Sequence, residues 1–368
     1  MQVYIIGPNN SKDIINPLAD AIVCGDHMPP VDLLSSTMPL DAARNEYFGK
    51  NTIIEIFNNQ GLDYKDYFFV FDQYLNLEGF DQHSFFYPVI LLYLVETFLV
   101  HSPSHEIDFS MKMASVNCPM NKNRSQRILA SCWFANNPVD DLVYTQFWSE
   151  QDNDTILHLD ELLQLGNLTD WTHSYGPECK MLNRRIGPIH NVTKVNSENL
   201  YEQITINFFE KISHMYYRTV FSVDLEPVFW EHGSMLTEKY INCIYGGTIP
   251  IVNGYQIYNN LNKLGFDTFS DIIDTSSQHQ RNPVLRIWNM LEKNKNVFSQ
   301  WKEIISDAQV QKRIVNNLKL IQCPEKIFEN SLKHVNQSAL QKVIDIKDSL
   351  KALRFPYIDM LNVSNRIK

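Results

Sequence analysis

Short apolar runs rich in β-branched and aromatic residues recur between polar segments over the first two thirds of the chain. Runs of this length and composition are typical of buried strands. They occupy residues 1–7, 21–24, 67–71, 111–117, 142–147, 220–223 and 248–252. Segments with helical character lie between them, around 41–48, 85–100, 128–136 and 240–245, while 52–57 is compatible with either a strand or a helix. Strands that alternate with helices predict an α/β fold with parallel, doubly wound sheets.

The most apolar segment of the chain is 85–100, which runs for 16 residues and contains Pro88 and Glu96. A helix that crosses a bilayer needs about 20 apolar residues. We therefore predict that this segment is a buried core helix, with an interfacial or acceptor-docking helix as the alternative.

A chain of 368 residues is long enough for two domains of ordinary size. The polar segment 101–108 is the expected linker between an N-terminal domain at 1–105 and a C-terminal domain at 106–320. Residues 150–200 have weaker periodicity and are interpreted as an insertion, and 321–368 as a C-terminal helical segment. From residue 282 onward the pattern is helical, with Trp288, Leu291, Phe298 and Trp301 as core candidates.

Composition excludes several classes of protein. The six cysteines form no CxxC pair, which argues against a zinc site or a disulfide framework. The net charge of −10 argues against a globally basic surface for nucleic acid, although it permits a local basic cleft. Residues 1–20 contain Asp13 and Asp20 and no long apolar core, so we expect no signal peptide and a cytoplasmic location.

The stretch 218–254 combines a strand, an acidic loop, a helix, a glycine stop and a second strand. Glu226 follows the first strand, at the end where open α/β sheets place their ligand groups. Thr237 or Ser234 is the expected N-cap of the helix, and Glu238 in its first turn favours the positive helix end. The helix is expected to stop at the glycines 246–247.

This stretch resembles a known donor-binding motif. Glu226, Leu-Thr-Glu-Lys at 236–239, the helix and Gly-Thr-Ile-Pro-Ile-Val at 247–252 are similar to the motif of α-1,3-fucosyltransferases and related glycosyltransferases. The chain more closely resembles glycosyltransferase-like proteins of phages and large viruses, and this likeness continues through 264–274 and covers about residues 110–320. The resemblance implies two Rossmann-like domains that face each other across a cleft (the GT-B type), with C-terminal helices packed across both. It also implies sugar transfer from a nucleoside-diphosphate sugar without a metal ion.

The resemblance assigns roles to individual residues. Lys239 is expected to contact the donor's phosphate, while Glu238 and Glu226 bind hydroxyls of the ribose or the donor sugar. Arg124 and Arg127 match a similar Asn-Arg-x-x-Arg element, which implies phosphate binding. The alternatives are an exposed ion pair at a helix start for Glu238 and Lys239, and a solvated basic turn for the two arginines.

Asp72 follows the predicted strand 67–71 and is the candidate general base for the acceptor hydroxyl. Asp26, Glu78 and His83 compete for this role, and a retaining reaction requires no base there. A competing pattern is Asp152-Asn153-Asp154, because two acids separated by one residue hold a divalent cation in metal-dependent glycosyltransferases. It stands in a polar run that is typical of a solvated loop.

The acceptor is the least determined part of the prediction. Segment 180–194 contains Lys180, Arg184, Arg185 and Lys194 and no acid, which fits a loop over phosphate, a strip for double-stranded DNA, or a solvated loop. The viral resemblance favours a hydroxymethylated base in phage DNA as acceptor. A glycan or lipid-linked saccharide acceptor is the alternative, and a degenerate protein that only binds sugar nucleotides is a third possibility.

Overall fold

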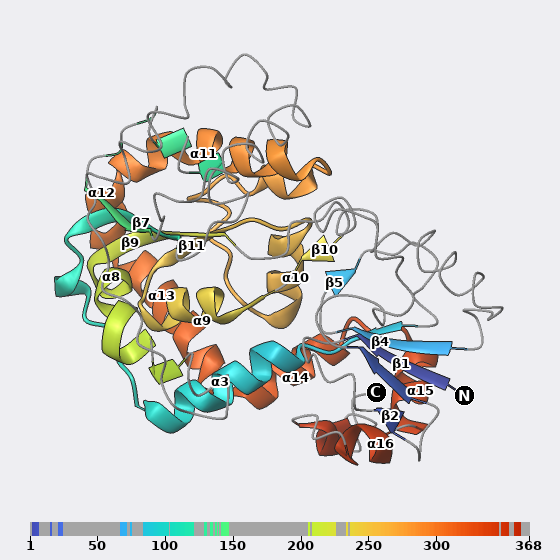
Figure 1. Ribbon diagram of the computed structural model, residues 1–368. Coiled ribbons are helices and arrows are strands. Elements are labelled where there is room, and N and C mark those ends of the chain that lie inside the picture. Colours follow the sequence, from blue (N-terminus) through green and yellow to red (C-terminus); the bar gives the residue numbers. More distant parts are fainter. Residues whose placement is uncertain are drawn as a thin grey trace, which may run out of the picture.

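Figure 1 shows the computed structural model of the chain. It describes residues 2–6, 15–16, 21–24, 67–71, 74–75, 84–102, 104–120, 129–130, 133–134, 137, 139, 141–146, 205–206, 208–225, 233–234, 236–345, 347–352 and 357–361.

The N-terminal sheet has the strand order β2-β3-β1-β4-β6. Its strands are β1 (Gln2–Ile6), β2 (Ile15–Asn16), β3 (Ala21–Cys24), β4 (Tyr67–Phe71) and β6 (Ser84–Phe86). The short edge strand β2 is antiparallel to β3, whereas the other pairs are parallel. The strands predicted at 1–7, 21–24 and 67–71 are confirmed.

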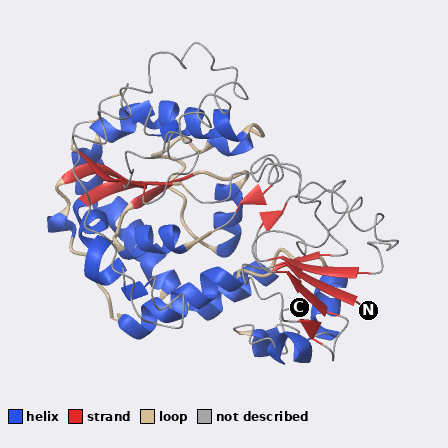
Figure 2. Cartoon of the chain, viewed as in Figure 1, coloured by secondary structure: helices blue, strands red, loops and turns tan. Residues whose placement is uncertain are grey.

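The second sheet is entirely parallel and has the order β11-β9-β7-β8. It consists of β7 (Ala114–Met120), β8 (Leu142–Gln146), β9 (Thr219–Asp224) and β11 (Ile249–Val252). The parallel strands of both sheets therefore run second, first, third, fourth in chain order, which is a doubly wound arrangement. The predicted α/β class with parallel sheets is confirmed (Figure 2).

Helices cover both faces of the second sheet, with α11 on one face and α9 on the other (Figure 1). The helical elements up to α11 are α3 (Val89–His101), η3 (Phe109–Met111), η5 (Phe208–Ile212), α8 (Ser213–Arg218), α9 (Glu238–Tyr245), α10 (Ile257–Leu264), η6 (Ser276–His279) and α11 (Pro283–Ser299). The later ones are α12 (Trp301–Ser306), α13 (Ala308–Ile321), α14 (Pro324–Leu332), α15 (Gln337–Asp345), α16 (Lys347–Ala352) and η7 (Ile358–Met360).

The C-terminal helices contact both halves of the chain. α13 packs against α9, and α14 packs against α10 and α3, whereas α15 contacts β6 of the N-terminal sheet. Of the predicted core candidates, Leu291, Phe298 and Trp301 are buried and Trp288 is half-buried.

The apolar segment at 85–100 contains two elements instead of one helix. β6 ends at Phe86, and α3 begins at Val89 after Pro88. Proline lacks the N–H that a continuous helix would use and fixes its own φ, which suits a helix start. α3 is buried against α9, with the rings of Phe98 and Tyr245 4.8 Å apart, so the prediction of a buried core helix is confirmed for this part.

The helices within the described ranges include none that is long and apolar enough to cross a membrane. At 1.5 Å per residue, the 13 residues of α3 extend only about 20 Å, against about 30 Å of hydrocarbon.

The predicted linker at 101–108 is fastened to the second sheet's helices. His105 Nε2 lies 2.7 Å from the carbonyl oxygen of Tyr245, and the His105 ring stacks on the Tyr245 ring. Gly247 has a φ of +64°, and a Cβ there would lie 2.5 Å from Ile107 Cγ2, so this turn requires glycine. The predicted boundary at 105/106 thus falls within a segment that packs against the end of α9, and the domain limits stay a prediction.

Lys112 holds the amino-terminal edge of the second sheet together. Its ammonium donates to the carbonyl oxygens of Tyr216, Thr219 and Gly246 at 2.9, 2.7 and 2.7 Å, and the residue is 8% exposed. Burial lowers the pKa of Lys112. The three carbonyls oppose that effect, because only the charged amine has three N–H donors.

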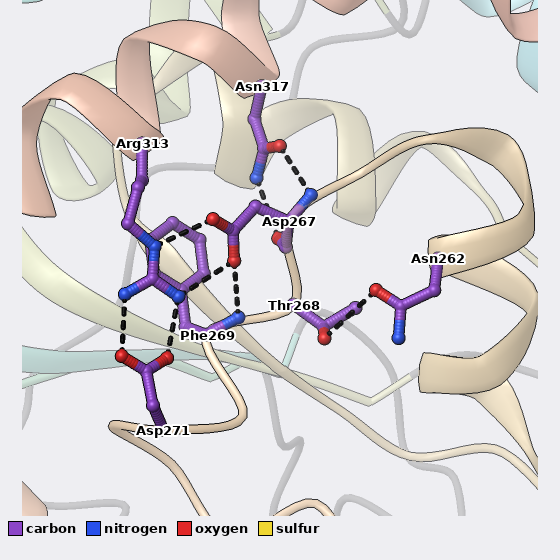
Figure 3. Close-up of polar contacts among 7 residues, drawn as sticks. All are labelled: Asn262, Asp267, Thr268, Phe269, Asp271, Arg313 and Asn317. Carbon is purple, nitrogen blue, oxygen red and sulfur yellow. Dashed lines mark hydrogen bonds and ion pairs between the residues drawn. The ribbon is translucent and has the colours of Figure 1, made fainter.

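The segment 264–274, which carries part of the family resemblance, is fixed to α13 by one arginine (Figure 3). The Arg313 guanidinium donates to Asp267 and Asp271 at 2.6–2.9 Å and lies 4.8 Å from the centre of the Phe269 ring. Asn317 accepts from the Asp267 N–H and donates to its carbonyl oxygen. These contacts give the segment a structural role.

Replacement of Lys112 by methionine keeps the aliphatic stem but leaves three buried carbonyl oxygens without their donor. We expect the free energy of unfolding to fall by about 3 kcal/mol, since each unsatisfied buried polar group costs about 1–3 kcal/mol. Urea unfolding measures the change, with Lys319→Met at an exposed site of α13 as control. Equal stability of the two variants would contradict the role of Lys112.

The ion pairs of Arg313 with Asp267 and Asp271 should make the free energy of unfolding depend on pH. Burial raises the pKa of Asp267, but Arg313 outweighs it, and the hydrogen bond from Arg313 lowers the pKa of Asp271. Carboxyls with lowered pKa stabilise the fold above their unfolded-state pKa of about 3.9, and this contribution is lost as the pH falls through their folded-state values.

Arg313→Met should therefore reduce stability by about 1 kcal/mol at pH 7, and the difference from the wild type should shrink below about pH 4. Urea unfolding at pH 7, 5 and 3.5 tests this, with the exposed neighbour Lys312→Met as control. A difference that stayed constant down to pH 3.5 would exclude the ionised pair as its source.

Candidate functional site

Only part of the predicted site falls within the described residues. Thr237, Glu238 and Lys239 are described. The other predicted site residues lie outside, namely Asp72, Arg124, Arg127 and Glu226, as do Asp26, Glu78, His83, Asp152–Asp154 and segment 180–194. Asp72 directly follows β4 in the sequence, and Glu226 is the second residue after β9.

The structure places Thr237, Glu238 and Lys239 together at the start of α9. Thr237 has an extended backbone and its Oγ1 accepts from the Lys239 N–H, so Thr237 is the N-cap and Ser234, which lies in the short strand β10 (Gly233–Ser234), is not. α9 ends at Tyr245, before the two glycines, as predicted. Because β9 and β11 are parallel and α9 connects them, the first turn of α9 lies at the carboxyl end of the sheet.

The Lys239 ammonium is buried and held by its neighbours. It donates to Thr237 Oγ1 and to Glu238 Oε1, both at 3.0 Å, and the side chain is only 7% exposed. An exposed ion pair, the alternative considered from the sequence, does not describe this lysine. A buried ammonium at a helix N-terminus adds its full charge to the partial positive charge of the helix end.

Glu238 is ionised in this arrangement. Burial by itself raises the pKa of the Glu238 carboxyl, but the charge of Lys239 and the hydrogen bond from its ammonium outweigh burial, so the pKa lies below its ordinary value. The side chain remains 29% exposed. The pair therefore presents one anionic acceptor and one cation side by side.

Asp224 lies two residues before the predicted site residue Glu226, ends β9 and is fully buried. Its backbone oxygen accepts from the Asn253 N–H at 3.2 Å, just beyond β11. Burial raises the pKa of Tyr240 and Tyr258, and the nearby charge of Asp224 raises both further. An acid at the end of an apolar strand run, Val-Phe-Ser-Val-Asp, is the signal that would have identified this position.

The start of α10 lies at the same edge of the sheet but is already occupied. The N–H groups of Tyr258 and Asn259 both donate to Gln278 Oε1, at 3.0 and 3.2 Å. The Tyr258 hydroxyl accepts from the Val252 N–H at 2.9 Å, which ties α10 to the edge strand β11. Of these two helix starts, only α9 has a buried cation in its first turn.

A short antiparallel ladder joins the two halves of the chain near this site. β5 (Tyr74–Leu75) pairs with β10, with Ser234 opposite Tyr74 and Gly233 opposite Leu75. Tyr74 is two residues beyond Asp72, and Ser234 is three residues before Thr237. The ladder thus connects the segment after β4 to the segment before α9 (Figure 1).

Within the described ranges, no group of three or more His, Cys, Asp and Glu side chains is arranged to hold a metal ion. The Asp152–Asp154 pattern lies outside these ranges, so the choice between metal-dependent and metal-independent chemistry stays a prediction.

Comparison of the chain with models of protein families, with curated proteins and with solved structures found no match.

Proposed function

We propose that this protein is a glycosyltransferase that moves a sugar from a nucleoside-diphosphate sugar to a hydroxyl acceptor. The observation that carries the proposal is the buried Lys239 ammonium at the first turn of α9, at the carboxyl end of a parallel, doubly wound sheet. Sheets of this kind bind ligands outside the carboxyl ends of their strands, at the point where the strand order reverses. In the second sheet that point lies between β7 and β9.

Two features favour a diphosphate at α9. Free N–H groups and the helix dipole attract anions to a helix N-terminus, and Lys239 supplies a full positive charge there. The first-turn amides of α10 are satisfied by Gln278, so they do not compete for phosphate. Glu238, ionised and partly exposed, suits hydroxyl groups of the ribose or the donor sugar.

The other proposed site residues complete the site in a GT-B arrangement, in which two domains face each other across a cleft. In the proposal, Arg124 and Arg127 follow β7 and neutralise the departing diphosphate together with Lys239, while Glu226 follows β9 and binds donor hydroxyls. Asp72 follows β4 and removes the proton from the acceptor hydroxyl. The β5–β10 ladder supports this pairing of halves, because it joins the segment after β4 to the segment before α9.

The acceptor class rests on the sequence resemblance alone. DNA with hydroxymethylated bases, bound through segment 180–194, is the first acceptor to test, and a glycan or lipid-linked saccharide is the second. A degenerate protein that binds sugar nucleotides without turnover shares the donor site and is separated from the enzyme by assays of transfer.

Lys239→Met should weaken the binding of nucleoside diphosphates while the protein stays folded, because methionine keeps the packing of the lysine stem and removes its charge. We expect a loss of about 1.5–3 kcal/mol of binding free energy, as for a hydrogen bond to a charged group. Isothermal titration calorimetry with GDP, UDP, ADP and CDP measures this loss. The matched control is Lys263→Met on the exposed face of α10, which should leave affinity unchanged.

Two results would argue against the donor site at α9. One is a wild-type protein that binds none of the four diphosphates and none of the corresponding nucleotide sugars. The other is a folded Lys239→Met variant whose nucleotide affinity equals that of the Lys263→Met control.

If helix dipole and cations replace a metal ion, sugar transfer should persist in excess chelator, and Asp154→Asn should leave it nearly unchanged. The assay follows labelled sugar from nucleotide sugar to acceptor with and without EDTA. Activity that disappears in chelator and returns with Mn²⁺ or Mg²⁺ would transfer the assignment to Asp152–Asp154.

A further inference from the structure

Gln278 is a buried, neutral side chain close to the edge of the second sheet where the donor site is proposed. It lies in η6 and is 5% exposed, between the starts of α10 and α11 at the carboxyl edge of the second sheet. Its backbone oxygen accepts from the Gln256 N–H at 3.0 Å, four residues beyond the end of β11. The buried Arg286, in the first turn of α11, donates to the carbonyl oxygen of Gln280 at 3.1 Å and holds the same turn from the other side.

The orientation of the Gln278 amide is determined by its partners. Two backbone N–H groups, of Tyr258 and Asn259, converge on one side-chain atom, so that atom must be the oxygen. The Nε2 atom, with two N–H donors, therefore points away from α10. In the described part of the chain no acceptor receives a hydrogen bond from it.

The surroundings of this amide favour an uncharged ligand group. The side-chain amide is neutral, the α10 amides beside it are already satisfied, and the buried Arg286 guanidinium of the same turn donates to the Gln280 carbonyl oxygen. A diphosphate is instead drawn to Lys239 at α9.

The strand order allows a nucleoside to lie on the side of Gln278. β11 is the edge strand next to β9, about 4.8 Å away. A nucleotide whose phosphates lie at the start of α9 can extend outward across the end of β11. The base, as the terminal group, then comes closest to the turn that carries Gln278.

We propose that the Gln278 side-chain amide selects the base of the bound nucleotide by donating a hydrogen bond to a keto oxygen. The site then favours guanine or uracil, which present an oxygen at ring position 6 or 4, over adenine or cytosine, which present an amino group there. An amino group opposite Nε2 would leave two donors facing each other, and buried groups left unpaired are the main source of such discrimination. This inference rests on the proposed function and names the class of its donor.

Gln278→Glu separates base selection from helix capping. Glutamate keeps one oxygen for the Tyr258 and Asn259 amides, and the helix dipole at the start of α10 offsets part of the cost of burying its charge. Thermal unfolding checks that the variant is folded. The second carboxylate oxygen replaces the two N–H donors with an acceptor. The side chain has nearly the same size, so recognition changes while packing does not.

The experiment compares the affinities of GDP, UDP, ADP and CDP by calorimetry for wild type and Gln278→Glu. The matched control is Gln280→Glu, which adds the same charge two residues away in the same turn. We expect the wild type to bind GDP or UDP about 10- to 100-fold more tightly than ADP and CDP. Gln278→Glu should abolish or reverse this preference, and Gln280→Glu should retain it.

Each other outcome is decisive. If the wild type binds nucleotides without preference between keto and amino bases, or if Gln278→Glu keeps the wild-type preference, then Gln278 only caps α10 and the base lies elsewhere, while the donor site at Lys239 stands. If no nucleotide or nucleotide sugar binds to the wild type at all, the proposed function fails and this inference fails with it.

Discussion

The register between β7 and β9 is the constraint on which the rest of the second half depends. β9 is buried along its whole length, so burial alone does not determine which residues of β9 pair with which residues of β7. Three buried polar side chains determine this pairing: Ser222 Oγ donates to Asn117 Oδ1 at 2.6 Å, and Asn117 Nδ2 donates to Thr219 Oγ1 at 2.6 Å. A shift of one residue would break both bonds and leave Asn117 and Ser222 without these partners in the core, at a cost of about 1–3 kcal/mol for each group, whereas Thr219 Oγ1 would keep its bond to the Met215 carbonyl oxygen. On its other side β9 pairs with β11, which sets Asp224 opposite Val252.

Two buried lysines lie at opposite ends of this sheet, and they differ in the kind of partner that holds them. Lys112, at the amino-terminal edge, gives each of its three N–H donors to a backbone carbonyl and closes the turns around α8 and α9. Lys239, at the carboxyl edge, is held by a hydroxyl and a carboxylate from its own helix turn. Backbone carbonyls cannot move away without unfolding the helix ends, whereas the Glu238 side chain can rotate. A phosphate can therefore compete for Lys239 but not for Lys112.

The family resemblance combines segments of two kinds. Residues 236–239 provide the N-cap, the carboxylate and the ammonium at the start of α9, which are groups that can meet a ligand. Residues 264–274 are tied to α13 through Arg313 and Asn317 and pack Phe269 under the guanidinium, which gives them a structural task. Of the two segments, only the first therefore bears on the chemistry of the proposed donor site.

Local pattern was sufficient for α9 and for most of the longer strands, but it placed β7 three residues too early, at 111–117, and missed the short strands β2, β5, β6 and β10. Short β-branched segments between turns have few other ways to become buried, and strands formed at 1–7, 21–24, 67–71, 220–223 and 248–252. The limits of α9 are set locally, by the N-cap Thr237 and by the glycines 246–247. Pro88 also marks the break between β6 and α3 in the sequence, although the apolar run 85–100 by itself predicts a single helix.

Contacts between distant segments could not be predicted from the sequence. Lys112 meets residues more than 100 positions away, Gln278 meets α10 from 20 positions away, and Asp224 acquires its place at the site only once β11 pairs beside it. Which polar side chains become buried, and against which partners, depends on the pairing of whole elements, and no short window of sequence contains that information.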